Sequence, residues 1–153
     1  MRIALFEPDI AGNVGAILRL GACMGVPVDL IEPMGFPWGT AAMRRAGMDY
    51  ADAVDVSRHV DWEAFRAATP GRLILATTRG ATGLWDVRFQ AGDVLLVGSE
   101  GRGVPDFVHQ AAALRVAIPM RPGLRSLNVA VAGAMILGEM LRQLRSTSGE
   151  PNG

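Results

Sequence analysis

The sequence contains no lysine: all 15 basic side chains among its 153 residues are arginines, and 15 acidic side chains bring the formal net charge to zero. A neutral chain lacks the overall positive charge that drives non-specific binding to nucleic acid, because such binding depends on neutralising phosphates. Several arginines nevertheless fall in expected loops or at the ends of expected elements, which leaves open a local phosphate-binding surface. The alternative is a composition bias that has replaced lysine throughout. The arginines in question are Arg44, Arg45, Arg79, Arg102, Arg121 and Arg125.

Cysteine and histidine are scarce. Cys23 is the single cysteine, which excludes an intramolecular disulfide, and its apolar neighbours lead us to expect it in the core. His59 and His109 stand alone, without a Cys or second His at metal-ligand spacing, so no metal site is expected. There is no uninterrupted run of 18 apolar residues and no recognisable signal peptide, so we expect a cytoplasmic protein without a membrane span.

Several familiar motifs are also missing. The chain has no G-x-S-x-G of α/β hydrolases. Its glycine-rich stretch GSEGRGVP, at 98–105, has neither the Rossmann spacing G-x-G-x-x-G nor the Lys-Ser/Thr that ends a P-loop, which disfavours a nucleotide-binding oxidoreductase. Its three glycines would let backbone groups approach a ligand, with Glu100 and Arg102 adding opposite charges, although such a turn can equally be structural.

What the chain does contain is an alternation of strand and helix patterns. Short apolar runs predict buried strands, and the helical spacing between them predicts crossover connections, which make neighbouring strands parallel. We expect one α/β domain over residues 1–153, with a mostly parallel sheet of five or six strands flanked by helices and a frayed tail at 146–153. The expected strands are 3–6, 28–31, 54–56, 73–77, 94–97 and 116–118; the expected helices lie between Asn13 and Gly25, at 41–46, at 62–68 after an Asp61 cap, and from about 127 to 144.

The stretch 115–143 organises the rest of the chain. In the loop before the last helix, Arg121 and Arg125 bring charge to Ser126 and Asn128, two side chains that can cap a helix start. The helix itself carries many small residues among its apolar ones. A face of small residues admits a closely packed neighbour, so we expect it to be buried against another element or a second subunit.

Four loops that leave expected strands have unusual compositions, namely 7–15, 77–83, 98–105 and 120–128. Ligands of open α/β sheets bind beyond the carboxyl ends of the strands. These loops are therefore the predicted ligand-binding region.

Blocks within these loops resemble the motifs of a known family. NVGAILR (13–19), LVGSEGRGVP (96–105) and IPM (118–120) with RSLN (125–128) are similar, in order and spacing, to the three motifs of the SPOUT (TrmH-like) RNA 2′-O-methyltransferases. The segment EPMGFPW (32–38) with MRRAGMDY (43–50) is similar to the TrmL branch, whose members methylate the wobble nucleotide of leucine tRNAs. The resemblance covers nearly the whole chain.

The resemblance implies a SPOUT fold with a C-terminal trefoil knot, a homodimer, S-adenosyl-L-methionine as cofactor and tRNA as partner. The implied reaction is 2′-O-methylation of the wobble nucleotide, cytidine or uridine 34. Carried over by position, the resemblance places the catalytic group at Asn13, Arg19, Glu100, Ser126 and Asn128. It places cofactor contacts at Ala76, Thr77, Gly98, Glu100, Gly103, Ile118, Ser126 and Leu127. The candidate RNA contacts are the loop arginines Arg44, Arg45, Arg102, Arg121 and Arg125.

Two further interpretations stay open. The sequence departs from the family pattern at Gly12, at Ala16 and in VAVAG at 129–133, so the methylated nucleotide could lie elsewhere in a tRNA or in rRNA. A non-catalytic RNA-binding protein of the same fold is the second, although it would have no need of all five catalytic residues. The family's proposed base corresponds to Arg19, and because arginine stays protonated in proteins this role is a hypothesis.

Overall fold

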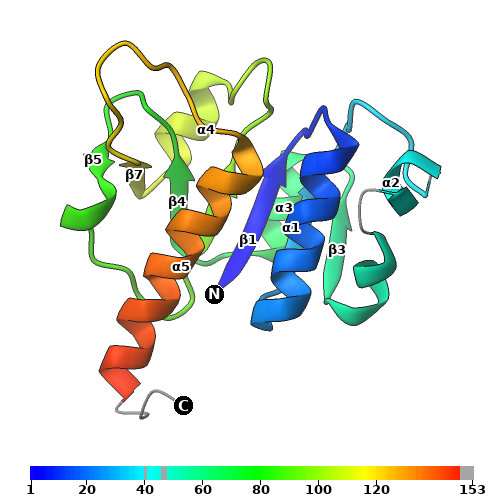
Figure 1. Cartoon of the computed structure of the whole chain (residues 1–153), viewed down its shortest axis with the longest axis horizontal. Coiled ribbons are helices and arrows are strands. Elements are labelled where there is room, and N and C mark those ends of the chain that lie inside the picture. Colours follow the sequence, from blue (N-terminus) through cyan, green and yellow to red (C-terminus); the bar gives the residue numbers. More distant parts are fainter. Residues whose placement is uncertain (40, 46–47, 149–153) are drawn as a thin grey trace.

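Seven parallel strands form the frame of the computed structural model, which describes residues 1–39, 41–45 and 48–148 (Figure 1). The sheet order is β3-β2-β1-β6-β4-β7-β5, and every neighbouring pair runs parallel. The strands are β1 (Arg2–Phe6), β2 (Val28–Ile31), β3 (Val56–His59), β4 (Leu73–Ala76), β5 (Thr82–Gly83), β6 (Val94–Val97) and β7 (Leu114–Ala117). The predicted α/β class and parallel sheet are confirmed.

Helices connect the strands. They are α1 (Ala11–Met24), α2 (Ala41–Arg45), α3 (Trp62–Ala68), α4 (Asp106–Ala111) and α5 (Val129–Ser148), with the 3-10 turns η1 (Met48–Ala53) and η2 (Leu84–Asp86). The sheet exceeds the predicted five or six strands because β5 has only two residues, too few to show a pattern. The six-residue α4 was likewise missed. The last helix continues to Ser148, and residues 149–153 of the expected tail lie outside the described residues.

Helices cover both faces of the sheet. Side chains alternate along β1, so Ile3 and Leu5 pack beneath α1 and α5, whereas Ala4 and Phe6 pack against α3 and α4 on the opposite face (Figure 1). Strands buried on both sides are hydrophobic throughout, which explains why apolar runs located most of them. The predicted burial of the small-residue helix is confirmed at Gly133, where an added Cβ would lie 3.4 Å from Ile3 Cδ1.

Four local expectations have different outcomes. Asp61 caps α3 as predicted, since its Oδ1 accepts a hydrogen bond from the amide of Ala64 at 2.8 Å. Gly25 ends α1 with φ of 66°, again as predicted. The third strand was placed too early: it begins at Val56 and continues through polar residues that an apolar pattern does not reveal. Cys23 is exposed rather than buried, because it lies about 200° around α1 from the buried Gly21.

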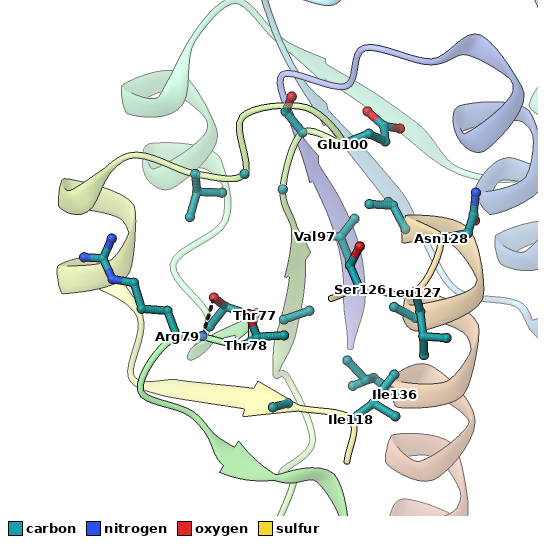
Figure 2. Close-up of a pocket in the computed structure, with 18 of the residues that line it drawn as sticks. Thr77, Thr78, Arg79, Val97, Glu100, Ile118, Ser126, Leu127, Asn128 and Ile136 are labelled. Carbon is teal, nitrogen blue, oxygen red and sulfur yellow. Dashed lines mark hydrogen bonds between the residues drawn. The ribbon is translucent and has the colours of Figure 1, made fainter. Parts of the chain in front are cut away.

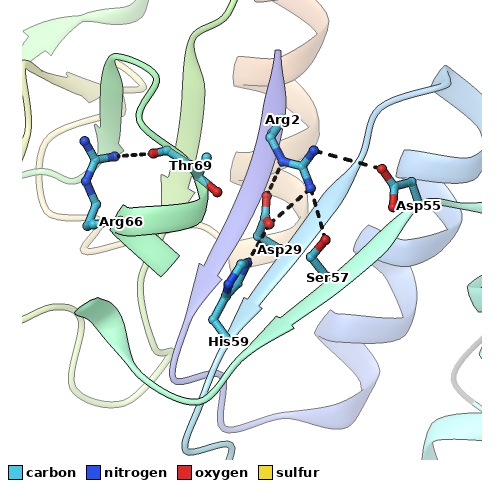
Figure 3. Close-up of polar contacts among 7 residues, drawn as sticks. All are labelled: Arg2, Asp29, Asp55, Ser57, His59, Arg66 and Thr69. Atoms are coloured by element: carbon cyan, nitrogen blue, oxygen red, sulfur yellow. Dashed lines mark hydrogen bonds and ion pairs between the residues drawn. The ribbon is translucent and has the colours of Figure 1, made fainter. Parts of the chain in front are cut away.

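A buried carboxylate joins three adjacent strands (Figure 3). Asp29 on β2 has no exposed surface and accepts a hydrogen bond from Arg2 Nε on β1 at 2.6 Å. His59 Nε2 on β3 lies 2.8 Å from the other oxygen of Asp29. A buried carboxylate is tolerated when it is paired and hydrogen-bonded, so these contacts account for the polar group inside the sheet.

Candidate functional site

A cavity of about 600 Å³ opens where the loops after β1, β4, β6 and β7 meet (Figure 2). These strands are consecutive in the sheet, so their carboxyl ends lie side by side. Each of the four loops singled out from the sequence contributes to its wall, together with α5. The cavity thus lies where open parallel sheets bind ligands.

Most residues assigned through the resemblance line this cavity. They are Asn13, Ala76, Thr77, Gly98, Glu100, Arg102, Gly103, Ile118, Ser126, Leu127 and Asn128. The wall does not include Arg19, Arg44, Arg45, Arg121 or Arg125. The wall also contains residues that the sequence analysis did not assign to a site, among them Ile10, Val97, Thr78, Arg79 and Ile136. Of these five, only Arg79 had a feature that could have indicated a site, because it is an arginine in an expected loop.

Three side chains form a continuous polar chain along one edge of the cavity. Asn128 Oδ1 accepts hydrogen bonds from the amides of Ala130 and Val131 at 2.9 and 3.2 Å, and thereby caps α5. Since backbone amides only donate, the Asn128 amide group must point its nitrogen toward Asn13, and it donates to Asn13 Oδ1 at 2.9 Å. Asn13 Nδ2 in turn donates to Glu100 Oε1 at 2.8 Å.

The helix that was expected to follow Asn13 begins two residues before it. Because α1 begins at Ala11, Asn13 lies inside its first turn, and its side chain reaches across to Glu100 and Asn128 instead of capping the helix. The residue in the cap position is Ile10, which makes no side-chain cap bond. At 7% exposure, Asn13 is buried with both ends of its amide satisfied, so its orientation is fixed.

The glycine-rich segment after β6 forms a tight turn. Ser99 and Gly103 exchange backbone hydrogen bonds of 3.1 and 2.8 Å, and Gly103 has φ of 66°, a conformation that favours glycine. Gly98 has no room for a side chain, since an added Cβ would lie 2.9 Å from the carbonyl carbon of Gly103. Arg102, at the tip of this turn, lies 3.6 Å from both Glu7 and Asp9.

The far end of the cavity carries polar groups from the loop after β4 and from α4. Thr77 Oγ1 accepts a hydrogen bond from the Arg79 amide at 3.2 Å, and the Arg79 guanidinium pairs with Asp106 at 2.6 Å. His109 is buried, and burial together with the positive charges of Arg79 and Arg115 lowers the pKa of its imidazole. The ring is therefore neutral near pH 7.

Arg19 lies on a different surface. It follows Asn13 by six residues on α1, which turns its side chain about 240° from Asn13 and moves it about 9 Å along the helix. Its guanidinium carbon lies 5.0 Å from the centre of the Tyr50 ring on η1. The structure thus brings Asn13, Glu100, Ser126 and Asn128 to one cavity and keeps Arg19 of the same chain outside it.

The make-up of the cavity suits an organic ligand. Its volume lies within the usual range for small-molecule sites, and apolar side chains such as Val97, Ile118, Leu127 and Ile136 face polar groups across it. Within the described residues, no group of three or more His, Cys, Asp or Glu side chains could hold a metal ion. No helix in that part of the chain is long and apolar enough to cross a membrane.

Residues 1–138 match the model of the SpoU rRNA Methylase family. The chain belongs to the SpoU methylase family. A curated relative within it, the tRNA (cytidine(34)-2′-O)-methyltransferase of Ancylobacter novellus, is 53% identical over 146 residues, which cover 94% of this chain and 92% of the relative.

Solved structures of SpoU-like proteins share the fold. One, from a study of the 2-OH methylation of C/U34 on tRNA, has a TM-score of 0.90 and 38% identity, covering 95% of this chain and 96% of its own. An AdoMet-bound rRNA methyltransferase from Sinorhizobium meliloti has a TM-score of 0.83 and 26% identity, covering 94% of this chain and 56% of its own. The similar proteins therefore include enzymes named for tRNA and an enzyme named for rRNA.

Proposed function

We propose that this protein is an S-adenosyl-L-methionine-dependent tRNA methyltransferase that modifies the 2′-hydroxyl of the wobble nucleotide, cytidine or uridine 34. The observation that carries the proposal is the polar chain of Glu100, Asn13 and Asn128 along the cavity. The relatives with 42–53% identity, which act on nucleotide 34, support the same reaction and favour it over an rRNA position. Leucine isoacceptors are the proposed substrates because 32–38 and 43–50 resemble the branch that modifies them.

The cavity has room and chemistry for the cofactor. When bound, S-adenosyl-L-methionine supplies a methyl group attached to a positively charged sulfur. Apolar side chains such as Ile118 and Leu127 provide surfaces for a purine ring, and the turn at Gly98 and Gly103 exposes backbone groups that can read its edges. The AdoMet-bound neighbour supports this assignment of the site.

The polar chain is suited to positioning a ribose hydroxyl. Such a hydroxyl must lose its proton while its oxygen forms the new bond to carbon, so placement of the oxygen and handling of the proton dominate catalysis. Glu100 accepts hydrogen bonds at both carboxylate oxygens, from Asn13 and from the Asp9 amide at 2.8 and 2.9 Å. We assign Asn13, Glu100, Ser126 and Asn128 to holding the nucleotide, since all four line the cavity and the hydrogen bonds of the polar chain orient three of them.

We further propose a homodimer in which Arg19 acts at the cavity of the second copy. Arg19 lies outside its own cavity, whereas an exposed apolar surface begins beside that cavity and continues along α5. Leu124, Leu127, Val131 and Met135 are 67%, 38%, 48% and 39% exposed. Apolar side chains gathered this way favour an interface, and in a two-fold symmetric dimer a contact of one Arg19 with the partner's cavity would be made twice.

The tRNA backbone would contact arginines around this site. Arg44 and Arg45 in the last turn of α2, and Arg121 and Arg125 in the loop before α5, are exposed and suited to phosphates. Arg102 is 69% exposed at the cavity mouth and is a fifth candidate.

Two further features belong to the proposal. The protein would act in the cytoplasm, where tRNA is processed. The loops after β4, β6 and β7 would form a trefoil knot, which the adjacency of these three strands supports.

The test is methyl transfer from labelled S-adenosyl-L-methionine to unmodified leucine tRNA transcripts, with the label mapped by nuclease digestion. Label on the ribose of nucleotide 34, and none on a transcript with a 2′-deoxy nucleotide there, supports the proposal. Label at another tRNA nucleotide, or in rRNA, shows that the proposed substrate is wrong. Binding of cofactor and tRNA without transfer to any RNA favours the non-catalytic alternative. Near-normal turnover by Arg19→Lys would remove Arg19 from the essential residues.

Mixing two inactive variants tests the shared site. Arg19→Ala and Asn13→Ala should each be inactive, but in a mixed dimer one cavity would have an intact Asn13 and receive the intact Arg19 from the other chain. Random pairing after co-expression should then restore about a quarter of wild-type activity. No recovery, or a monomeric mass at micromolar concentration, contradicts the dimer proposal.

A further inference from the structure

Asp9 lies in the short loop between β1 and α1 and makes an unusual set of contacts with the glycine-rich turn. Its side chain is 31% exposed, and it does not line the cavity. No pattern in the sequence selects it, because an acidic residue in a loop is ordinarily a solvated one. The contacts it makes all converge on the segment that carries Glu100.

Asp9 bonds to three consecutive residues. Its backbone amide donates to Glu100 Oε2 at 2.9 Å, which holds one carboxylate oxygen directly. Its own Oδ2 accepts a short hydrogen bond from the hydroxyl of Ser99 and a longer one, 3.4 Å, from the amide of Gly101. Asp9 therefore holds the residue before Glu100, the residue after it and the Glu100 carboxylate itself.

The loop around Asp9 is supported from behind. Gly35 packs so closely against it that an added Cβ would lie 2.9 Å from Asp9 Cα, and the Gly35 amide donates to the Pro8 carbonyl at 2.9 Å. Glu7, two residues earlier, has φ of 42°, a conformation that costs a non-glycine residue energy and persists only where surrounding contacts enforce it. Arg102 at the tip of the turn is held 3.6 Å from both Glu7 and Asp9.

We propose that Asp9 is a positioning residue of the methyltransferase site, which fixes the Glu100 carboxylate and, through it, the amide of Asn13. This inference rests on the proposed function. Asp9 touches neither the cavity nor the reacting atoms, and its effect passes through the turn at 99–101. The hydroxyl of Ser99, followed by the Gly101 amide and Arg102, lowers the pKa of the Asp9 carboxyl, so it stays ionised as an acceptor through the neutral range.

The expected consequence is a loss in kcat with little change in cofactor affinity. Asp9→Ala removes both side-chain bonds to the turn, and displacement of Glu100 by a fraction of an ångström should lower kcat between about tenfold and a hundredfold. Asp9→Asn keeps a side-chain oxygen that can take the place of Oδ2 and accept from both the Ser99 hydroxyl and the Gly101 amide, so it should recover most of that loss. The dissociation constant of S-adenosyl-L-homocysteine should change less than about threefold, because the backbone bonds between Ser99 and Gly103 keep the Gly98 and Gly103 part of the turn in place without the Asp9 side chain.

A double-mutant cycle separates positioning from general stability. In a Glu100→Gln background, measured in single turnovers with labelled cofactor, adding Asp9→Ala should lower the rate less than about twofold, because the group it positions is already altered. Asp61→Ala, which removes the cap of α3 away from the cavity, is the matched control for a destabilised chain and should retain wild-type kcat below its melting temperature.

The failure of the positioning role and the failure of the proposed function give different results. If Asp9→Ala retains wild-type kcat, if Asp9→Asn is as impaired as Asp9→Ala, or if the loss is as large in the Glu100→Gln background as in the wild type, the positioning role is refuted while the proposed function stands. If the wild-type protein transfers no methyl group to tRNA, both fall. The role is established if Asp9→Ala lowers kcat in the wild-type background but not in the Glu100→Gln background, and if Asp9→Asn remains active.

Discussion

Replacement of Asn128 tests the polar chain most directly, because this one side chain both caps α5 and orients Asn13. Asn128→Ala removes the cap, which contributes about 1 kcal/mol to the free energy of unfolding. It also removes the bond to Asn13, worth about another 1 kcal/mol. For a chain of this length, a total of about 2 kcal/mol lowers the melting temperature by roughly 4–8 °C.

Asn128→Asp separates the two roles. A carboxylate still accepts from the amides of Ala130 and Val131, and the negative charge favoured at the start of a helix offsets most of the lost bond to Asn13, so the melting temperature should stay within roughly 2 °C of wild type. The carboxylate has no hydrogen to donate, and Asn13 then lies between two acceptors. Whichever way the Asn13 amide turns, its oxygen faces either the introduced carboxylate or Glu100, so the productive arrangement is lost.

Both variants should therefore lose turnover, by about tenfold or more, while only Asn128→Ala loses stability. Methyl transfer to leucine tRNA and thermal unfolding followed by circular dichroism measure the two effects. Asp61→Ala provides the control in which a helix cap is lost and turnover is kept. Wild-type turnover in Asn128→Asp, or an unchanged melting temperature in Asn128→Ala, would refute the reasoning.

Three further outcomes follow from local geometry. Gly98→Ala places a Cβ 2.9 Å from the Gly103 carbonyl carbon, so calorimetry should show binding of S-adenosyl-L-homocysteine weakened by about tenfold or more; unchanged affinity contradicts this. Phe65→Ala empties a fully buried site and should cost about 3–5 kcal/mol in urea denaturation, whereas a loss under about 1 kcal/mol would show that the core closes around the missing ring. Hydrogen bonds from Arg142 and then Gln143 lower the pKa of Glu139 to about 2, so its stabilising contribution is complete above its ordinary value of 4.5 and disappears as the pH falls toward 2. The melting-temperature difference between wild type and Glu139→Gln should be largest near neutral pH and vanish near pH 2; a constant difference argues against the assignment.

The fold was predictable from the sequence where a strand is covered on both faces of the sheet and is therefore apolar throughout. Strands β2 and β6 and helix α3 were located correctly from apolar runs and from one capping residue, Asp61. The errors arise where packing overrides pattern. The polar residues Ser57 and Arg58 interrupt the apolar pattern of β3, so its extent was not predicted. The start of α1 at Ala11 was not predicted because the residue before it, Ile10, is not a capping residue. Tertiary contacts decide such boundaries, and a single sequence does not contain them.

The site was predictable as a set of loops but not as a set of contacts. Glycines and strand ends indicated the loops that form the cavity, and the family motifs indicated Asn13, Glu100 and Asn128. Which atoms meet depends on through-space geometry: Arg102 is two residues from Glu100, yet its guanidinium lies 3.6 Å from Asp9 in the loop after β1. The angle between Asn13 and Arg19 follows from their spacing on one helix, but the neighbour that Arg19 meets, the Tyr50 ring on η1, depends on how α1 packs against the rest of the chain.

The arginines show how a chain with zero net charge can present a positive surface. One group of arginines forms ion pairs with carboxylates. It includes Arg2 with Asp29 and Arg72 with Asp93, and both of these aspartates are buried. Along the described part of the chain, no carboxylate lies within ion-pair distance of Arg44, Arg45, Arg121 or Arg125. Electrostatic steering depends on the local field rather than on net charge. Because part of the acidic charge is paired with other arginines, the zero net charge conceals arginines without an ion-pair partner at α2 and at the loop beside the cavity.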